Sequence, residues 1–184
     1  MIPEVPLTDG VVLRPAAERD AEGLLHAYVR NSEHLRRWEP RRPAEFFTLP
    51  GQVHRLKDLL AQQAQGRAMP WLLVHGDRVV GRMTLSTIVR GPWLSADLGY
   101  WIDAGYAGRG LTTRAVLEVC RMADQDLGLH RIAAGTLLDN VASQSVLRKA
   151  GFELYGTAPR YLEIDGHWQD HRLFQRILND RPAF

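Results

Sequence analysis

The chain has 184 residues, of which 45% are hydrophobic and 24% are charged. A chain of this size and composition can bury one hydrophobic core without disulfides or a structural metal, which argues against the disordered and collagen-like classes. The net charge is only +2, from 23 Lys and Arg against 21 Asp and Glu, so no overall positive field indicates a nucleic-acid partner.

Cysteine usage and the N-terminal sequence indicate the compartment. Cys120 is the single cysteine, so it has no partner for an internal disulfide, and a reducing compartment fits. Met1–Pro6 lacks the basic start and the apolar run of a signal peptide, and no stretch has the length needed to cross a bilayer. We therefore expect a cytoplasmic protein that does not bind a membrane.

The first third of the chain is predicted to contain one strand and two helices. Residues 11–14 are typical of a short strand, which Pro15 closes. Apolar residues recur at helical spacing from 18 to 38, with a break expected near Asn31-Ser32, and again from 52 to 65.

A basic run, residues 36–42, joins the two predicted helices and contains four arginines and one tryptophan. Such a run could contact an acidic substrate protein or a phosphate. A solvated helix end with its loop is the commoner explanation, because short charge clusters are frequent on protein surfaces.

The middle of the chain is predicted to change to strand spacing. Residues 71–75 and 78–85 are expected to form a hairpin, and residues 96–102 a third strand. The helix with the clearest pattern spans residues 111–127, which carry an apolar stripe on one side, and Gly128 is its expected C-terminal cap.

The last third of the chain continues the alternation of strand and helix. A strand at 130–135 and a helix at 141–149 are followed by a hairpin of residues 160–164 and 167–174. A strand, helix and strand unit implies a parallel pair with a right-handed crossover. The sequence therefore predicts an α/β fold, in which one mixed sheet carries helices on its faces.

A glycine-rich loop, residues 105–113, separates the 96–102 strand from the start of the clearest helix. Glycines let backbone N–H groups turn to one side, and the first helical turn adds unpaired donors and the positive end of the helix dipole, so this arrangement can bind phosphate. Arg109, Thr112 and Thr113 can add side-chain donors. The glycine spacing matches neither the dinucleotide fingerprint nor a P-loop, and glycine at a tight turn is by itself a weak signal.

Four motifs follow one another in the last two thirds of the chain. They are Leu98-Gly99-Tyr100-Trp101-Ile102, Gly108-Arg109-Gly110-Leu111, Asp139-Asn140 with Ser143, and Arg148-Lys149-Ala150-Gly151-Phe152. In this order and spacing they resemble the GNAT N-acetyltransferase superfamily, and within it the RimJ/RimL-type protein N-terminal acetyltransferases. The first third of the chain matches only in its expected order of strand and helices.

The resemblance implies one domain over residues 1–184. Its mixed, mostly antiparallel sheet would contain a central, splayed pair of parallel strands with helices on both faces. Residues 18–65 would form the acceptor-side helices, residues 93–152 the acetyl-CoA-binding core, and residues 153–178 a C-terminal hairpin. A homodimer is also expected from the resemblance alone.

The resemblance further implies where acetyl-CoA would bind. Trp101 and Ile102 would offer backbone groups to the pantetheine arm, and the pyrophosphate would lie on the loop formed by Ala107, Gly108, Arg109, Gly110, Leu111, Thr112 and Thr113. Asn140 would reach the cofactor arm, although an asparagine there could simply cap the following helix. Two positions depart from the usual pattern, because Ala107 replaces Gln or Arg and Thr112 replaces Gly or Ala.

Transfer of an acetyl group to an amine needs a base for the amine and an acid for the leaving thiolate. Many members of the superfamily place a tyrosine acid where this chain has Leu147, so Ser143 is the expected substitute, with Tyr155 and Tyr161 as alternatives. Asp97 is the candidate base, acting through water, and Glu163 a candidate to bind the incoming ammonium. Each carboxylate could equally be a surface charge on a strand.

Other reactive side chains are expected to be structural. Cys120 lies on the core side of its helix, so packing explains it better than nucleophilic chemistry. His167 and His171 are four apart in a predicted strand, which is not the spacing of a helical metal pair, so no metal is expected. Of the tryptophans at 38, 71, 93 and 168, which could line an acceptor cleft, Trp71 is better explained as core.

These observations predict an enzyme that moves an acetyl group from acetyl-CoA to a primary amine by direct attack. The resemblance implies the N-terminal α-amine of a protein, such as a ribosomal protein, as the acceptor. Three alternatives stay open: acetylation of a small-molecule amine or antibiotic, a noncatalytic acyl-CoA-binding module, and nucleotide binding through the glycine-rich loop.

Overall fold

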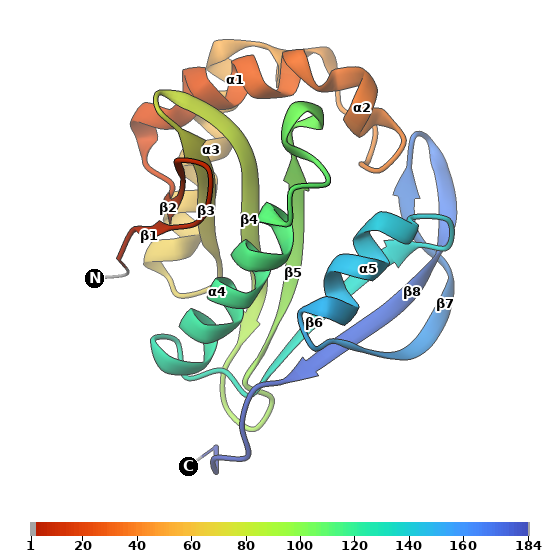
Figure 1. Cartoon of the computed structure of the whole chain (residues 1–184). Coiled ribbons are helices and arrows are strands. Elements are labelled where there is room, and N and C mark those ends of the chain that lie inside the picture. Colours follow the sequence, from red (N-terminus) through yellow and green to blue (C-terminus); the bar gives the residue numbers. More distant parts are fainter. Residues whose placement is uncertain (1–2, 184) are drawn as a thin grey trace.

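The structure, a computed structural model, describes residues 3–183 (Figure 1). Within those residues eight strands form one sheet in the order β1-β2-β3-β4-β5-β6-β8-β7. Neighbouring strands are antiparallel except β5 and β6, which are parallel. The predicted mixed, mostly antiparallel sheet with a central parallel pair is therefore confirmed.

The elements follow the chain in the order that the sequence predicted, with short additions. The strands are β1 (Val5–Pro6), β2 (Val11–Pro15), β3 (Met69–His75), β4 (Arg78–Val89), β5 (Ser95–Ile102), β6 (Arg131–Leu137), β7 (Glu153–Ile164) and β8 (His167–Ile177). The helices are α1 (Ala21–Arg30), α2 (Ser32–Arg36), α3 (Leu49–Ala64), α4 (Leu111–Gln125) and α5 (Val141–Lys149). Short 3₁₀ helices are η1 (Glu18–Asp20), η2 (Ala44–Phe47) and η3 (Ala104–Tyr106).

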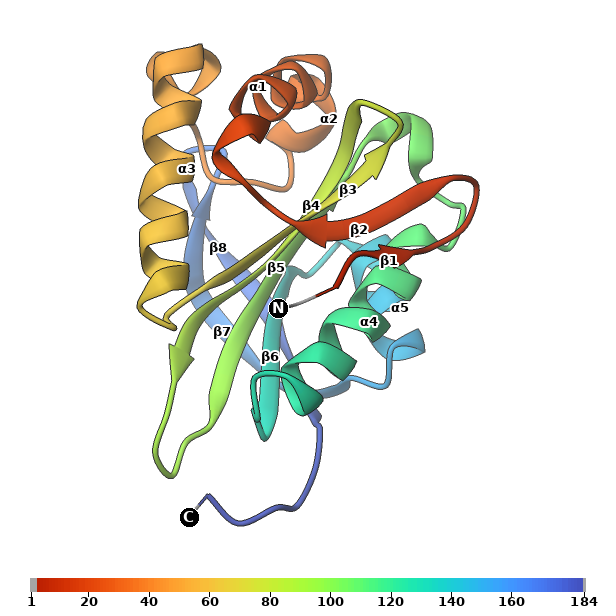
Figure 2. The same ribbon diagram turned by 90° about the vertical axis from the view of Figure 1, so that its left-hand side faces the viewer.

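Helices cover both faces of the sheet, as expected. Helices α4 and α5 lie on one face, and α1, α2 and α3 lie on the other (Figures 1 and 2). Side chains alternate along each strand, so the sheet supplies two cores. Trp71, Met83 and Phe174 belong to the core that α4 joins, whereas Leu72 and Trp101 pack with α1 and α3.

The expected break in the first long helix is confirmed at Asn31. Its side chain is only 2% exposed, and the amide nitrogen donates to the Ala27 carbonyl at 2.9 Å. Because an asparagine side chain that bonds the backbone competes with regular helical pairing, α1 ends at Arg30 and the short α2 begins at Ser32. The side-chain oxygen of Asn31 remains available and accepts a hydrogen bond from the Ala104 amide.

The C-terminal hairpin is longer than the sequence predicted. Strand β7 begins at Glu153 and not near residue 160, and its pairing with β8 shifts register twice, between 154 and 156 and between 158 and 162. Pro159 falls in the second irregularity, where a missing N–H costs no regular ladder bond. Pairing with β8 keeps residues 153–158 extended as well.

None of the helices within residues 3–183 is long and apolar enough to span a membrane.

Candidate active site

The two central parallel strands separate after three residue pairs. Strands β5 and β6 pair only at Ser95 with Arg131, Ala96 with Ile132 and Asp97 with Ala133. Strand β5 then continues to Ile102 and β6 to Leu137, so the facing edges of both strands lack a strand partner beyond this point. Unpaired backbone N–H and C=O groups along β5 are therefore available to a ligand.

A cavity of about 490 Å³ occupies the gap between the separated strands. Its walls come from β4, β5, β6, β8, the end of β7, α2 with the segment that follows it, the loop before α4, and the first turns of α4 and α5. The residues that matter below are Leu98, Gly99, Tyr100, Trp101, Ile102, Ala107, Gly108, Thr112, Gly135, Asn140, Ser143 and His171. A volume of this order suits an extended small-molecule ligand.

The glycine-rich loop ends in the bare N-terminus of α4. Gly108 and Gly110 have φ angles of 77° and 75°, in the left-handed region that glycine adopts without strain. Gly110 is the N-cap residue and supplies no side-chain hydrogen bond to the first turn. The amides of Leu111, Thr112 and Thr113 are therefore uncapped by a side chain there, and they stand beside the positive end of the helix dipole.

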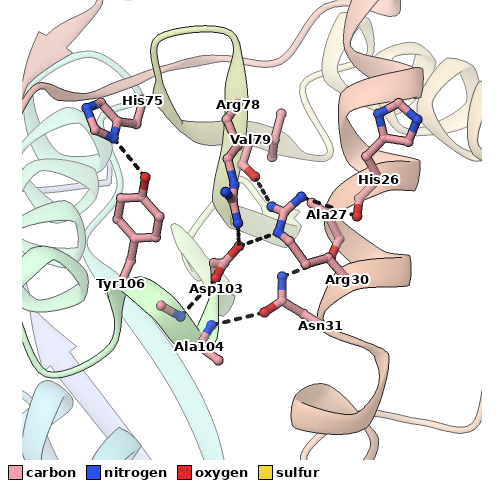
Figure 3. A network of polar contacts seen from close by, with 11 residues as sticks. His26, Ala27, Arg30, Asn31, His75, Arg78, Val79, Asp103, Ala104 and Tyr106 are labelled. Carbon is pink, nitrogen blue, oxygen red and sulfur yellow. Dashed lines mark hydrogen bonds and ion pairs between the residues drawn. The ribbon is translucent and has the colours of Figure 1, made fainter.

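A buried carboxylate fixes the start of this loop to α1 (Figure 3). The Asp103 side chain is 4% exposed and accepts hydrogen bonds from Arg30 Nε at 2.7 Å, Arg78 at 3.3 Å and the Gly105 amide at 2.9 Å. The Asn31 side-chain oxygen accepts from the Ala104 amide at 3.0 Å. Burial alone would raise the pKa of Asp103, but these donors outweigh it and lower the pKa to about 2.

A pair of hydroxyls lies on the α5 side of the cavity. Asn140 caps α5, because its side-chain oxygen accepts from the Ser143 amide at 3.1 Å. The Ser143 hydroxyl in turn lies 2.8 Å from the Tyr100 hydroxyl on β5. Burial raises the pKa of Tyr100 to about 12, even though the bond to Ser143 lowers it, so the tyrosine is protonated at neutral pH.

Comparison with known proteins agrees with this geometry. A family model described as "Acetyltransferase (GNAT) domain" matches residues 11–153, which is more than half of the chain. The chain belongs to the GNAT acetyltransferase family. It is 35% identical to the [ribosomal protein uS5]-alanine N-acetyltransferase of Escherichia coli (strain K12), over 94% of this chain and 90% of that protein.

Solved structures of GNAT proteins of the RimJ type superpose closely. The ribosomal-protein-S5-alanine acetyltransferase from Vibrio fischeri gives a TM-score of 0.94 at 32% identity and covers 98% of this chain and 100% of its own. Mycobacterium smegmatis RimJ in complex with CoA-disulfide gives 0.87 at 30% identity, with 94% and 85% covered. The predicted family and the predicted enzyme class, an acetyltransferase, are confirmed.

The GNAT cofactor residues predicted from the resemblance divide into two groups. Trp101, Ile102, Ala107, Gly108, Thr112 and Asn140 line the cavity, whereas Arg109, Gly110, Leu111 and Thr113 do not. The Arg109 guanidinium stacks on the Tyr106 ring, 5.1 Å from its centre, and Leu111 is 1% exposed in the core. The residues of this second group at the start of α4 could still bind a phosphate through their backbone N–H groups.

The structure separates the three predicted catalytic residues. Ser143 lines the cavity, but Asp97 and Glu163 do not. Asp97 is exposed where β5 and β6 separate, close enough to Tyr161 to help raise the pKa of that phenol, which burial raises first. Glu163 is exposed on β7, and strand alternation turns it away from Leu162 and Ile164, which do line the cavity.

Leu147 has no proton to donate and cannot take the acid role that the resemblance places at this position. Leu147 is fully buried in the core under α5. Ser143 lies one helical turn earlier on the same side of α5, where it reaches the cavity. The alternative acids lie further out, because Tyr155 and Tyr161 are about half exposed at 49% and 50%, and neither lines the cavity.

Sequence reasoning missed Tyr100, although a signal was present. Leu98, Tyr100 and Ile102 alternate along β5, and Leu98 belongs to the core under α4, so Tyr100 must face α4 and α5. His171, expected to be solvent-facing or structural, is 4% exposed and lies at the cavity wall. Among the tryptophans, Trp38 lines the cavity and Trp71 is fully buried, while Trp93 and Trp168 are largely exposed.

Proposed function

We propose that the chain transfers an acetyl group from acetyl-CoA to a primary amine, and that the amine is the N-terminal α-amine of a protein. The observation that carries this proposal is the juxtaposition of three features: the separated β5 and β6 edges, the bare N-terminus of α4 at one end of the cavity, and the Ser143–Tyr100 pair at its side. The E. coli relative is named for the alanine of ribosomal protein uS5, which supports a protein N-terminus as the acceptor.

The cavity is extended enough for acetyl-CoA, and the residues that line it match the polar groups of that molecule. The uncapped amides of α4 suit its pyrophosphate, and the unpaired edge of β5 beyond Asp97 suits the amides of its pantetheine arm. Gly108 and Ser143 line the same cavity, so one extended ligand can reach both. Acetyl-CoA supplies the activated thioester, and the protein holds it beside the amine so that direct attack needs no covalent intermediate.

Ser143 is proposed as the acid for the leaving thiolate. The amine nitrogen forms the new C–N bond and loses a proton, through water, to the proposed base Asp97 as the C–S bond breaks. The Ser143 hydroxyl protonates the sulfur while it takes the proton of Tyr100. Tyr100 recovers a proton from solvent. Because the pKa of Tyr100 is about 12, this reservoir stays protonated over the working pH range.

Asp97 is the proposed base, through water, because it stands exposed where the two strands separate. We do not assign Glu163 a role in the reaction, since its side chain faces away from the cavity.

The experiment is an acetylation assay with an N-terminal peptide panel and a panel of small amines. Release of free thiol and the mass of the product are measured for the wild type, for Ser143→Ala and for the control Val141→Ala, which alters an exposed residue of α5. We expect Ser143→Ala to lower kcat by about tenfold to a hundredfold with unchanged CoA affinity, and the control to match the wild type.

The competing functions give different results. Acetylation of small amines without acetylation of peptides would show a small-molecule enzyme. Tight CoA binding with no turnover on either panel would indicate a noncatalytic acyl-CoA-binding module. Affinity for an adenine dinucleotide without affinity for CoA would contradict the cofactor assignment altogether.

The proposal includes a cytoplasmic location and a homodimer. Cys120 is the single cysteine and is buried as a free thiol, which suits a reducing compartment. Sedimentation at micromolar concentration tests the homodimer, and a monomer under those conditions would contradict it.

A further inference from the structure

Three arginines gather around two aromatic rings on the acceptor side of the sheet. Arg42 follows α2, Arg55 is on α3 and Arg82 is on β4. The guanidinium carbons of Arg42 and Arg55 lie 5.0 and 4.9 Å from the centre of the Phe46 ring, and that of Arg82 lies 5.8 Å from the Tyr28 ring. The two ring centres are 4.6 Å apart, so segments distant in sequence bring three positive charges together.

The positive charges of this arginine cluster (Arg42, Arg55 and Arg82) are largely uncompensated. Glu39 pairs with Arg42 at 3.4 Å. In the described part of the chain, Arg55 and Arg82 form neither an ion pair nor a side-chain hydrogen bond. Burial lowers the pKa of Arg55, and its neighbours Arg42 and Arg82 lower it further. Arg42 and Arg82 are half-buried and Arg55 is exposed. Like charges held close together favour binding of an anion.

Unpartnered donors mark the same place. The Nε atoms of Arg42 and Arg82 and the hydroxyl of Thr84 are buried and have no hydrogen-bond partner in the protein. A buried donor without an acceptor costs about 1 to 3 kcal/mol, and two of these three donors belong to arginines. A ligand with several acceptor oxygens would satisfy them.

A cavity connects Arg55 and Arg82 with the proposed site of acetyl transfer, whereas Arg42 lines a separate cavity beside α2. A space of about 390 Å³ lies between α3 and the sheet, and Arg55, Arg82, Thr84 and Gly99 line it. Arg82 and Gly99 also line the 490 Å³ cavity between β5 and β6. A Cβ atom at position 99 would meet no other atom within 4 Å, so Gly99 leaves open the place where the two cavities approach each other. Asp58 lines the smaller cavity too, but it is exposed and pairs with His54.

We propose that Arg55 and Arg82, assisted by Arg42, form a subsite for a carboxylate of the acceptor whose amine is acetylated. The inference rests on the proposed function, because it takes the amine to lie in the β5–β6 cavity. A carboxylate supplies two acceptor oxygens and a negative charge, and arginine binds it with charge-assisted hydrogen bonds. It could be an acidic side chain near a protein N-terminus or the α-carboxylate of a free amino acid.

The test compares acceptors that differ only in the carboxylate. Binding of Ala-Ala-Glu-Ala and Ala-Ala-Gln-Ala peptide amides, and of alanine and alaninamide, is measured by calorimetry on the CoA-loaded protein, and their acetylation is followed by thiol release. We expect the acidic member of one pair to bind about tenfold more tightly than its neutral partner. The pair that shows the preference identifies the source of the carboxylate.

The variants Arg55→Gln and Arg82→Gln test the assignment to these residues. Each is expected to weaken binding of the acidic ligand about tenfold and to leave the neutral ligand unchanged, which removes the preference. Arg67→Gln removes the same charge from an exposed arginine and should keep the preference. Unchanged CoA affinity in each variant shows that the fold is intact.

The outcomes separate this inference from the proposed function. Acetylation of all acceptors with no preference for a carboxylate would overturn the subsite and leave the enzyme assignment standing. A preference in binding that survives both variants would also overturn it. Absence of acetylation would count against the proposed function, while the calorimetric comparison would still decide whether the cluster binds a carboxylate.

Discussion

Replacement of Asp103 by Asn should weaken the contact between α1 and the glycine-rich loop, and the resulting loss of folding stability should depend on pH. The folded pKa of about 2 lies below the ordinary value of 3.8. At about 1.4 kcal/mol per pKa unit, the ionised carboxylate contributes about 2 kcal/mol to folding at neutral pH. The side chain is 4% exposed, so solvent screens this contribution little.

The sign of the pH dependence follows from the lowered pKa. The stabilisation is complete above the unfolded pKa of 3.8 and is lost as the pH falls from there towards 2. Between about pH 7 and pH 3, the difference in unfolding free energy between wild type and Asp103→Asn should therefore shrink by about 1 kcal/mol. The measurement is urea unfolding at both pH values.

The control is Asp77→Asn, which changes an exposed carboxylate in the turn between β3 and β4 and should leave stability nearly unchanged. The same variants are assayed for the KM of acetyl-CoA, which should rise in Asp103→Asn because Asp103 holds Gly105 at the start of the loop. A stability difference that is equal at both pH values would refute the electrostatic account.

Three further changes are expected to have separable effects. Tyr100→Phe should lower kcat about tenfold with unchanged CoA affinity. The pH profile of the wild type should show no titration of this phenol below pH 10, since its pKa is about 12. An unchanged kcat would show that Tyr100 does not supply a proton to Ser143. Gly110→Ala forces a φ of 75° on a residue with a Cβ at a cost of about 1 kcal/mol and should raise the KM for acetyl-CoA. The control Gly128→Ala, with a φ of 63° beyond the opposite end of α4, should cost similar stability and leave the KM unchanged. Leu147→Ala should cost about 3 kcal/mol of stability in a thermal or urea melt, because Leu147 is fully buried, while turnover per folded molecule stays near that of the wild type; a comparable loss of turnover would place Leu147 in the catalytic site.

Local patterns carried most of the fold prediction. The apolar stripe of α4 and the glycines before it are determined by neighbours in sequence, so both appeared where expected. The extents of β4 and β7 were harder, because both strands continue through interruptions of their pairing, where Thr87 and Arg160 take positive φ angles. The local sequence of a strand does not indicate where its pairing with a strand distant in the chain will end.

The candidate site shows the same division. The glycine-rich loop and the uncapped start of α4 could be predicted because they are formed by consecutive residues. The Tyr100–Ser143 bond joins residues 43 apart, and the Arg30–Asp103 bond joins residues 73 apart. The arginine cluster gathers three separate segments, of which only Arg42 lay in a basic run visible in the sequence. Contacts of this kind arise from the packing of α1, α3 and α5 against the sheet, which periodicity alone does not specify.

Because Cys120 is buried, the folded protein should contribute little signal of its own to a thiol assay. The side chain is 1% exposed, and burial raises the pKa of its thiol to about 11, so the reactive thiolate is scarce at neutral pH. A colorimetric thiol reagent added to the folded protein should therefore report released coenzyme rather than the protein itself. The same cysteine becomes a built-in marker of unfolding, since alkylation there requires the core beneath α4 to open.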